Sequence, residues 1–238
     1  MGGYGQFCSI ARAHEVLGGR WTLLIAREIL CGSTRFNDIR RGIPRISRTM
    51  LSERLQELVF AGALTKIDGE HGPEYELTQA GEELAAVVGA LGTWGQRWLP
   101  RLAHDEDNDL EPLLIDMQRR VRFEALPKDP VVVRFEVDQR LRRFMLLKPT
   151  EASICVTNPG FPELSIHSPL FALVSWWRGD CTFFETRRMG LRVTGKSELI
   201  HAFPDWFERY QLAGIPSEAK GARPHANPAG AVRIPNLL

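Results

Sequence analysis

Cysteine, net charge and long apolar runs are all scarce in this sequence of 238 residues. Its four cysteines show no CxxC spacing and no nearby histidine pair, which disfavours a structural zinc site and a disulfide framework. No segment approaches the roughly 18 apolar residues of a membrane span, and the first residues do not resemble a signal peptide. We therefore expect a cytoplasmic protein with no metal and no membrane contact.

Catalytic motifs are missing as well. The sequence contains no nucleophile elbow, no phosphate-binding loop and no carboxylate pair at catalytic spacing. His167 and His201 each stand alone among apolar neighbours, where a histidine is usually structural. We expect no enzymatic activity and no cofactor.

Positive and negative charges nearly balance, with a net charge of +1 and a pI of about 7.8. General attraction to nucleic acid usually shows as a strong basic excess, so any DNA-binding surface here has to be local. The chain length favours two domains, and an apolar content of 44% allows both to bury a core.

The first hundred residues predict a helix-turn-helix followed by a β-hairpin. Ser33 or Thr34 is expected to cap the third helix, Ser47 the fourth and Thr78 the last, with Gly42-Ile43-Pro44 as the turn. The expected helices cover 10–17, 21–29, 35–41, 47–61 and 78–98, and the expected strands cover 64–67 and 75–78. A helix-turn-helix followed directly by a hairpin is typical of a winged helix.

Six arginines lie between residues 35 and 54 against only two acidic residues, so the positive charge gathers on this motif. Arginine-rich helix faces are often merely solvated, but this cluster coincides with the helix that would enter a major groove. Arg48 is the first choice for a base contact, whereas Arg40, Arg41 and Arg45 are better placed for phosphates. The candidate DNA-binding residues are Arg35, Arg40, Arg41, Arg45, Ser47, Arg48, Thr49, Ser52, Arg54 and Lys66.

Several motifs occur here in the order of a known family. They are Cys8-Ser9-Ile10, LGGRWTLLI (17–25), RFNDI (35–39), IPRISRTMLSERL (43–55) and YELTQAG (75–81). Over about residues 7–99 the chain closely resembles the HxlR-type winged-helix transcriptional regulators. The resemblance implies a homodimer that forms through the first helix and helix 78–99 and binds a palindromic operator. The apolar stripe of that last helix would then be partly dimer surface.

Two positions qualify the resemblance. The tip of the wing carries Asp68 and Glu70, which phosphate repels, so Lys66 and His71 are the only plausible donors there. Cys8 lies where part of the family carries a redox-sensing thiol, and an inert cysteine in the dimer interface is the alternative reading.

The second half predicts an α+β domain behind an acidic linker. The expected domains are 1–103 (DNA binding and dimerisation), 104–111 (linker), 112–215 (ligand binding) and 216–238 (a disordered tail). The expected elements are helices 113–125 and 170–177, a helical stretch 196–210, and strands 131–137, 144–147, 153–157 and 182–185. Ser168 is expected to cap the second of these helices.

The order of these elements resembles the sterol-carrier-protein-like fold, in which a sheet and helices enclose a lipid tunnel. The resemblance implies an apolar ligand, with Phe171, Val174, Trp177 and Phe207 as candidate lining residues. The same residues also suit an ordinary core.

These patterns together favour a homodimeric DNA-binding transcriptional regulator of mixed α+β fold, modulated by an apolar ligand in its second domain. Two alternatives stay open. One is a lipid carrier or a small-molecule-modifying enzyme that uses its first domain only for dimerisation. The other is a thiol redox switch acting through Cys8.

Overall fold

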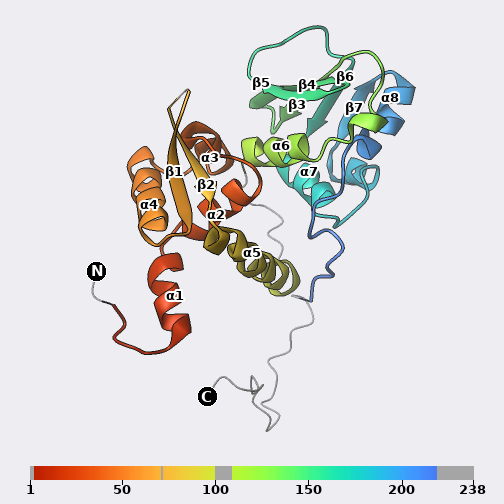
Figure 1. Ribbon diagram of the computed structural model, residues 1–238. Coiled ribbons are helices and arrows are strands. Elements are labelled where there is room, and N and C mark those ends of the chain that lie inside the picture. The colour runs from red at the N-terminus through yellow and green to blue at the C-terminus, as the bar shows by residue number, and fades with distance from the viewer. Residues whose placement is uncertain (1–2, 71, 100–108, 219–238) are drawn as a thin grey trace.

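The computed structural model describes residues 3–70, 72–99 and 109–218 of the chain. Most of the expected linker and most of the expected tail therefore lie outside the described residues, as does His71. Two packed units follow each other along the chain (Figure 1). No helix within the described ranges is both long and apolar enough to cross a membrane.

The first unit is a winged helix-turn-helix. Its elements are α1 (Ser9–Leu17), α2 (Thr22–Leu30), α3 (Phe36–Gly42), α4 (Arg48–Phe60), β1 (Leu64–Gly69), β2 (Gly72–Leu77) and α5 (Gln79–Trp98). The antiparallel hairpin β1–β2 forms the wing, with Leu64 opposite Leu77. The expected order of helices and strands is confirmed throughout this unit.

Two of the three expected helix caps are confirmed. The hydroxyl of Ser47 accepts a hydrogen bond from the backbone of Met50, and the hydroxyl of Thr78 accepts one from Gly81. The expected cap of α3 by Ser33 or Thr34 is wrong, because Arg35 occupies the N-cap position without a side-chain cap.

One apolar cluster holds the helix-turn-helix together. Ile43 and Ile46 of the turn between α3 and α4 are buried in it, so the turn is fixed by its own side chains. The inward face of α4 supplies Leu51, Leu55 and Leu58, each at most 1% exposed. The opposite face of α4 is thereby left toward solvent.

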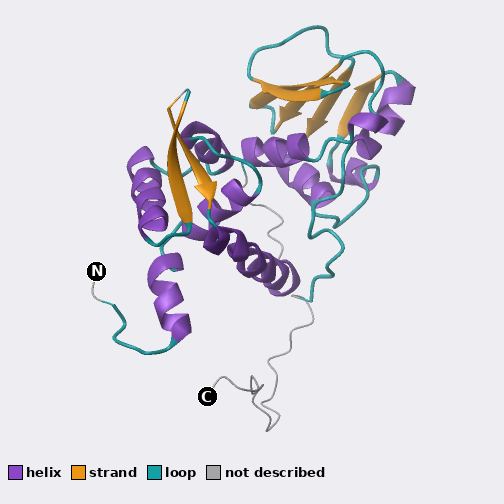
Figure 2. Ribbon diagram, viewed as in Figure 1, coloured by secondary structure: helices purple, strands orange, loops and turns teal. Residues whose placement is uncertain are grey.

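The second unit is an α+β domain with a five-stranded sheet in the order β5-β4-β3-β6-β7. Its strands are β3 (Val131–Val137), β4 (Leu141–Lys148), β5 (Glu151–Cys155), β6 (Leu164–Ser168) and β7 (Arg192–Gly195). Its helices are α6 (Leu110–Arg119), α7 (Leu170–Trp177) and α8 (Ser197–Ala202), with short 3-10 turns η1 (Phe123–Ala125), η2 (Glu185–Met189) and η3 (Phe203–Trp206). Helices α6 and α7 lie on one face of the sheet (Figure 2).

Several sequence expectations for this unit are wrong. The strand expected over 182–185 is absent, because these residues lead into η2, while β6 and β7 were not expected. The first helix begins earlier than expected, at Leu110, and ends at Arg119. Ser168 does not cap α7; the carboxylate of Asp138 accepts the hydrogen bond from the backbone of Leu170 instead. A helical stretch was expected over 196–210. The structure has α8 followed by η3 there, and η3 ends at Trp206.

Candidate nucleic-acid interface

The solvent-facing side of α4 presents polar side chains. Arg48, Thr49 and Gln56 are exposed on this face, and Ser52 lies half-buried beside them. Arg48 has no ion-pair partner among the described residues. A free guanidinium near the start of an exposed helix is the group that reads guanine in a major groove.

Two of the expected DNA-binding arginines are engaged inside the first unit. The guanidinium of Arg54 lies beside Gly19 and pairs with the carboxylate of Glu57. Arg35 donates to the carboxylate of Glu74 on β2 over 2.9 Å, which ties the start of α3 to the wing. Both side chains therefore already have anionic partners within the domain.

Arg41 and Arg45 face the second unit. Arg41 donates to Glu111 over 3.1 Å, and Arg45 donates to Asp109 over 3.0 Å. Both acceptors belong to α6 or to the residue that precedes it, and Glu111 also accepts from Arg143 of β4 over 3.0 Å. Carboxylates of the second unit thus occupy two arginines that the sequence assigned to phosphates.

The remaining expected contacts are of mixed accessibility. Lys66 is exposed on β1, whereas Arg40 is half-buried and its Nε has no hydrogen-bond partner among the described residues. Ser47 is exposed but its hydroxyl is used by the helix cap.

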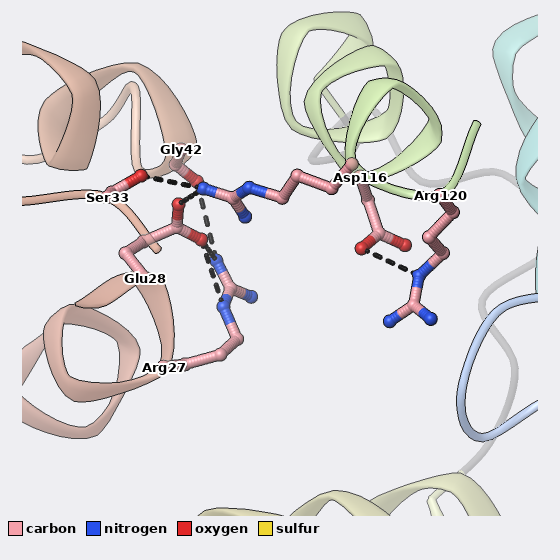
Figure 3. Close-up of polar contacts among 7 residues, drawn as sticks. Arg27, Glu28, Ser33, Gly42, Asp116 and Arg120 are labelled. Atoms are coloured by element: carbon pink, nitrogen blue, oxygen red, sulfur yellow. Dashed lines mark hydrogen bonds and ion pairs between the residues drawn. The ribbon is translucent and has the colours of Figure 1, made fainter. Parts of the chain in front are cut away.

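A buried ion pair joins α2 to α6. The carboxylate of Glu28 is 2% exposed and accepts hydrogen bonds from Arg27 over 2.5 Å and from Arg119 over 2.7 Å (Figure 3). Arg119 also donates to the hydroxyl of Ser33 over 2.8 Å, and Arg27 to the carbonyl of Gly42 over 3.4 Å. A buried carboxylate requires such partners, so this network fixes α6 against the helix-turn-helix.

Sequence reasoning missed this junction, although a signal for it exists. Glu28 follows Ile25 by three residues and precedes Ile29, so helical spacing places its carboxylate on the buried face of α2. A charge on an apolar face calls for an opposite charge from another element. The identity of that partner, 91 residues away, cannot be read from local spacing.

Three of the four residues expected to line an apolar ligand site, Val174, Trp177 and Phe207, lie in or against the core of the second unit. Trp177 and Phe207 are buried, and their ring centroids are 6.0 Å apart. Trp177 also donates its indole N–H to Asp116 over 2.7 Å. Phe171 and Val174 on the same helix are half-buried.

The thiols are spread over both units. Cys8 is half-buried at the N-cap of α1, and Cys31 is exposed after α2. Cys155 and Cys181 are half-buried in the second unit. Burial and the nearby carboxylate of Glu185 raise the pKa of the Cys181 thiol. Within the described ranges, no cluster of histidine, cysteine and acidic residues suits a metal ion.

Comparisons with known proteins bear on the first unit. The family model described as HxlR-like helix-turn-helix matches residues 16–103. The HTH-type transcriptional regulator Mb3122 of Mycobacterium bovis is 43% identical over 96 residues, which are 39% of this chain and 60% of the relative. The chain thus spans about three fifths of the length of that mycobacterial relative. YvaP of Bacillus subtilis, also an HTH-type transcriptional regulator, is 36% identical over 91 residues, which are 37% of this chain and 84% of the relative.

Two solved structures each resemble just over a third of the chain. The HTH-type regulator ytcD is 30% identical and gives a TM-score of 0.35, over 37% of this chain and 94% of its own. The reduced form of the redox regulator HypR is 32% identical and gives a TM-score of 0.34, over 37% of this chain and 89% of its own. With a family model and relatives in agreement on the winged helix, the chain belongs to the HxlR-like helix-turn-helix transcriptional regulators.

Proposed function

We propose that this protein is a sequence-specific DNA-binding regulator in which α4 reads the major groove. The observation that carries the proposal is the exposed face of α4. Arg48, Thr49 and Gln56 are exposed to solvent on this face, while the apolar face of the same helix is fully buried. These side chains contact the base edges, and Ser52 lies beside them. Lys66 on the wing and the arginines of α3 and the turn contact phosphates.

We propose further that the protein binds DNA as a homodimer on a palindromic site. In the single chain α1 buries none of its residues, and nine residues are too few for a stable isolated helix. An apolar stripe on α5 is also exposed, made of Val87, Leu91, Trp94 and Trp98. A partner copy that covers both surfaces places two α4 helices about one turn of DNA apart.

The second domain regulates this activity through its contact with the DNA-binding arginines. Because Asp109 and Glu111 pair with Arg45 and Arg41, DNA phosphates have to compete with them for the same guanidinium groups. Any ligand that binds the docked and released arrangements unequally then shifts DNA affinity. An apolar ligand beside α7 would first have to displace rings that already pack on one another.

Fluorescence anisotropy on duplexes selected from a random pool tests the proposal. Tight binding to a palindrome, resistant to scrambled competitor and steeply salt-dependent, is the expected result. Weak binding that is indifferent to sequence would reduce the winged helix to a dimerisation module. A lipid carrier or a small-molecule-modifying enzyme would then be the better hypothesis.

A thiol switch at Cys8 is a second candidate function. Cys8 occupies the N-cap of α1, and its side chain is partly open to solvent on a helix that we assign to the dimer surface. Oxidation there would alter dimer packing and thereby the spacing of the two α4 helices. If diamide still abolishes DNA binding in a Cys8→Ala protein, the thiol switch at Cys8 is ruled out.

A further inference from the structure

The outer face of the second domain's sheet, opposite α6 and α7, carries a row of charged residues across four strands. Glu136 on β3 pairs in register with Arg142 on β4 and with His167 on β6, and His167 pairs in register with Arg192 on β7. Partners in register point to the same face of a sheet, so these four side chains form one row.

The acidic member of the row is already neutralised by its neighbours. The carboxylate of Glu136 lies 2.9 Å from Arg142 Nη2 and 2.8 Å from His167 Nδ1, and 3.7 Å from Arg134 Nε. With Nδ1 engaged, the Nε2 atom of His167 is left for another partner. Arg192 at the end of the row has no carboxylate partner among the described residues.

A large cleft lies over this row. It has a volume of about 1060 Å³, and its walls include the β3–β4 turn and the two residues that precede α7, Ser168 and Pro169. The charged and histidine side chains that line it are Glu136, Asp138, Arg140, Arg142, His167 and Arg192.

The second carboxylate of the cleft is also used by the fold. Asp138 accepts the backbone hydrogen bond that opens α7, and its own backbone N–H donates to the carbonyl of Ser168. Asp138 and Gln139 both hold left-handed backbone conformations, with φ of 52° and 57°. These two residues shape the turn so that the next residue, Arg140, lines the cleft. Arg140 has no carboxylate partner within the described chain.

We propose that this cleft binds a small organic anion that carries phosphate or carboxylate groups. Arg140 and Arg192 supply free guanidinium groups, and Glu136 holds Arg142 at the end of the row opposite Arg192. Guanidinium groups bind both kinds of anion through paired, charge-assisted hydrogen bonds. The volume accommodates a ligand well beyond the size of a single phosphate ion.

The ligand class differs from the apolar molecule that the sequence predicts for this domain. The aromatic side chains near α7 fill the interior on the helix-covered face of the sheet, whereas the cleft lies on the other face and is lined by charge. The inference stands independently of DNA binding, since every residue of the site belongs to the second domain.

Isothermal titration calorimetry on the full chain tests the proposal, with inorganic pyrophosphate and citrate as probes. Each is titrated at constant ionic strength set with sodium chloride. Saturable binding of at least one probe is the expected result, and the preferred probe tells phosphate from carboxylate chemistry. A double variant, Arg140→Gln with Arg192→Gln, should weaken that binding about tenfold or more, because two charge-assisted hydrogen bonds are lost.

Arg122→Gln is the matched control, because Arg122 is an exposed arginine of the same domain that pairs with Glu124 outside the cleft. It should bind the probe as the parent chain does. All three substituted arginines are exposed, so circular dichroism should show an unchanged fold. No saturable binding of either probe at up to about 10 mM, or equal binding by the double variant, would overturn the proposal.

Discussion

Glu28 of the winged helix and Arg119 of the second domain form an ion pair in which a carboxylate only 2% exposed meets a guanidinium 2.7 Å away. This pair crosses the boundary between two units that the sequence predicts as separate domains. Because this pair is buried, the two units are in direct contact and are not joined by the linker alone. The position of α6, and with it of Asp109 and Glu111, follows from this contact.

Removing Arg119 should therefore destabilise the chain. In an Arg119→Ala protein the buried Glu28 keeps only Arg27, and Ser33 loses its hydrogen-bond donor. We expect a loss of about 1–3 kcal/mol, read as a lower midpoint in urea unfolding. Arg122→Ala removes an exposed pair with Glu124 and should change stability by less than about 0.5 kcal/mol. Equal midpoints for the two variants would show that the buried pair contributes nothing.

Gly42 should be essential for a steric reason. A Cβ at this position would overlap the carboxylate of Glu28, so Gly42→Ala must shift that buried carboxylate and weaken its pairing with Arg27 and Arg119. We expect a loss of several kcal/mol, in the upper range of single substitutions. Gly89 is the control, since nothing lies within 4 Å of a Cβ there and it sits inside α5. Gly89→Ala should stabilise the helix by about 0.5–1 kcal/mol. A Gly42→Ala protein as stable as the parent would refute the steric account.

Much of the first unit could be predicted from sequence because its signals are local. Ser47 and Thr78 are capping residues followed by apolar periodicity, and the structure places both as N-caps. The second unit was harder, because β6 is a parallel neighbour of β3 and its position depends on a long crossover. The strand expected at 182–185 is absent because these residues lead into η2, and tertiary packing of Phe183 on Trp176 and Phe203 holds them there.

In the candidate site, too, local features could be predicted from the sequence and long-range contacts could not. Exposure of Arg48 follows from helical spacing alone, and the structure agrees with it. The partners of Arg41 and Arg45 lie 70 and 64 residues away, so no local pattern could reveal that these arginines are paired. Long-range electrostatic partners are set by the packing of α6 on the first unit, which sequence periodicity does not specify.

Arg48 should contribute to sequence selectivity. In Arg48→Ala we expect DNA binding weakened by about 1–3 kcal/mol and a relaxed base preference at one position of each half-site. Lys66→Ala is the comparison, because a phosphate contact from the wing should weaken all duplexes alike and lower the salt slope. Selection from a random pool with each variant distinguishes the two. An Arg48→Ala protein that selects the parent's operator unchanged would remove Arg48 from base readout.

Cys181 should react slowly with alkylating reagents. Burial and the carboxylate of Glu185 raise the pKa of its thiol, so at neutral pH a smaller fraction is present as the reactive thiolate. Cys31 is exposed and should be labelled first by iodoacetamide in a time course followed by peptide mass spectrometry. Raising the pH should accelerate labelling of Cys181. Labelling of Cys181 ahead of Cys31 at neutral pH would contradict this expectation.

The carboxylates at the start of α6 should restrain DNA binding. In a double variant, Asp109→Asn with Glu111→Gln, Arg41 and Arg45 lose the acceptors that compete with phosphate. We expect tighter DNA binding and a steeper salt dependence, by up to about 0.9 in logarithmic slope for each arginine released. Anisotropy titrations from low to moderate salt measure both quantities.

The control for this variant has to remove the same charge elsewhere in the second domain. Glu124→Gln with Glu151→Gln does so, because both carboxylates are exposed and pair with Arg122 and Lys148 of their own domain rather than with arginines of the winged helix. General electrostatic repulsion of DNA by the second domain would make the two double variants equally tight binders. Direct competition at Arg41 and Arg45 instead confines the gain to the variant at α6. Unchanged affinity and slope in that variant would mean that these ion pairs do not limit access of DNA to the arginines.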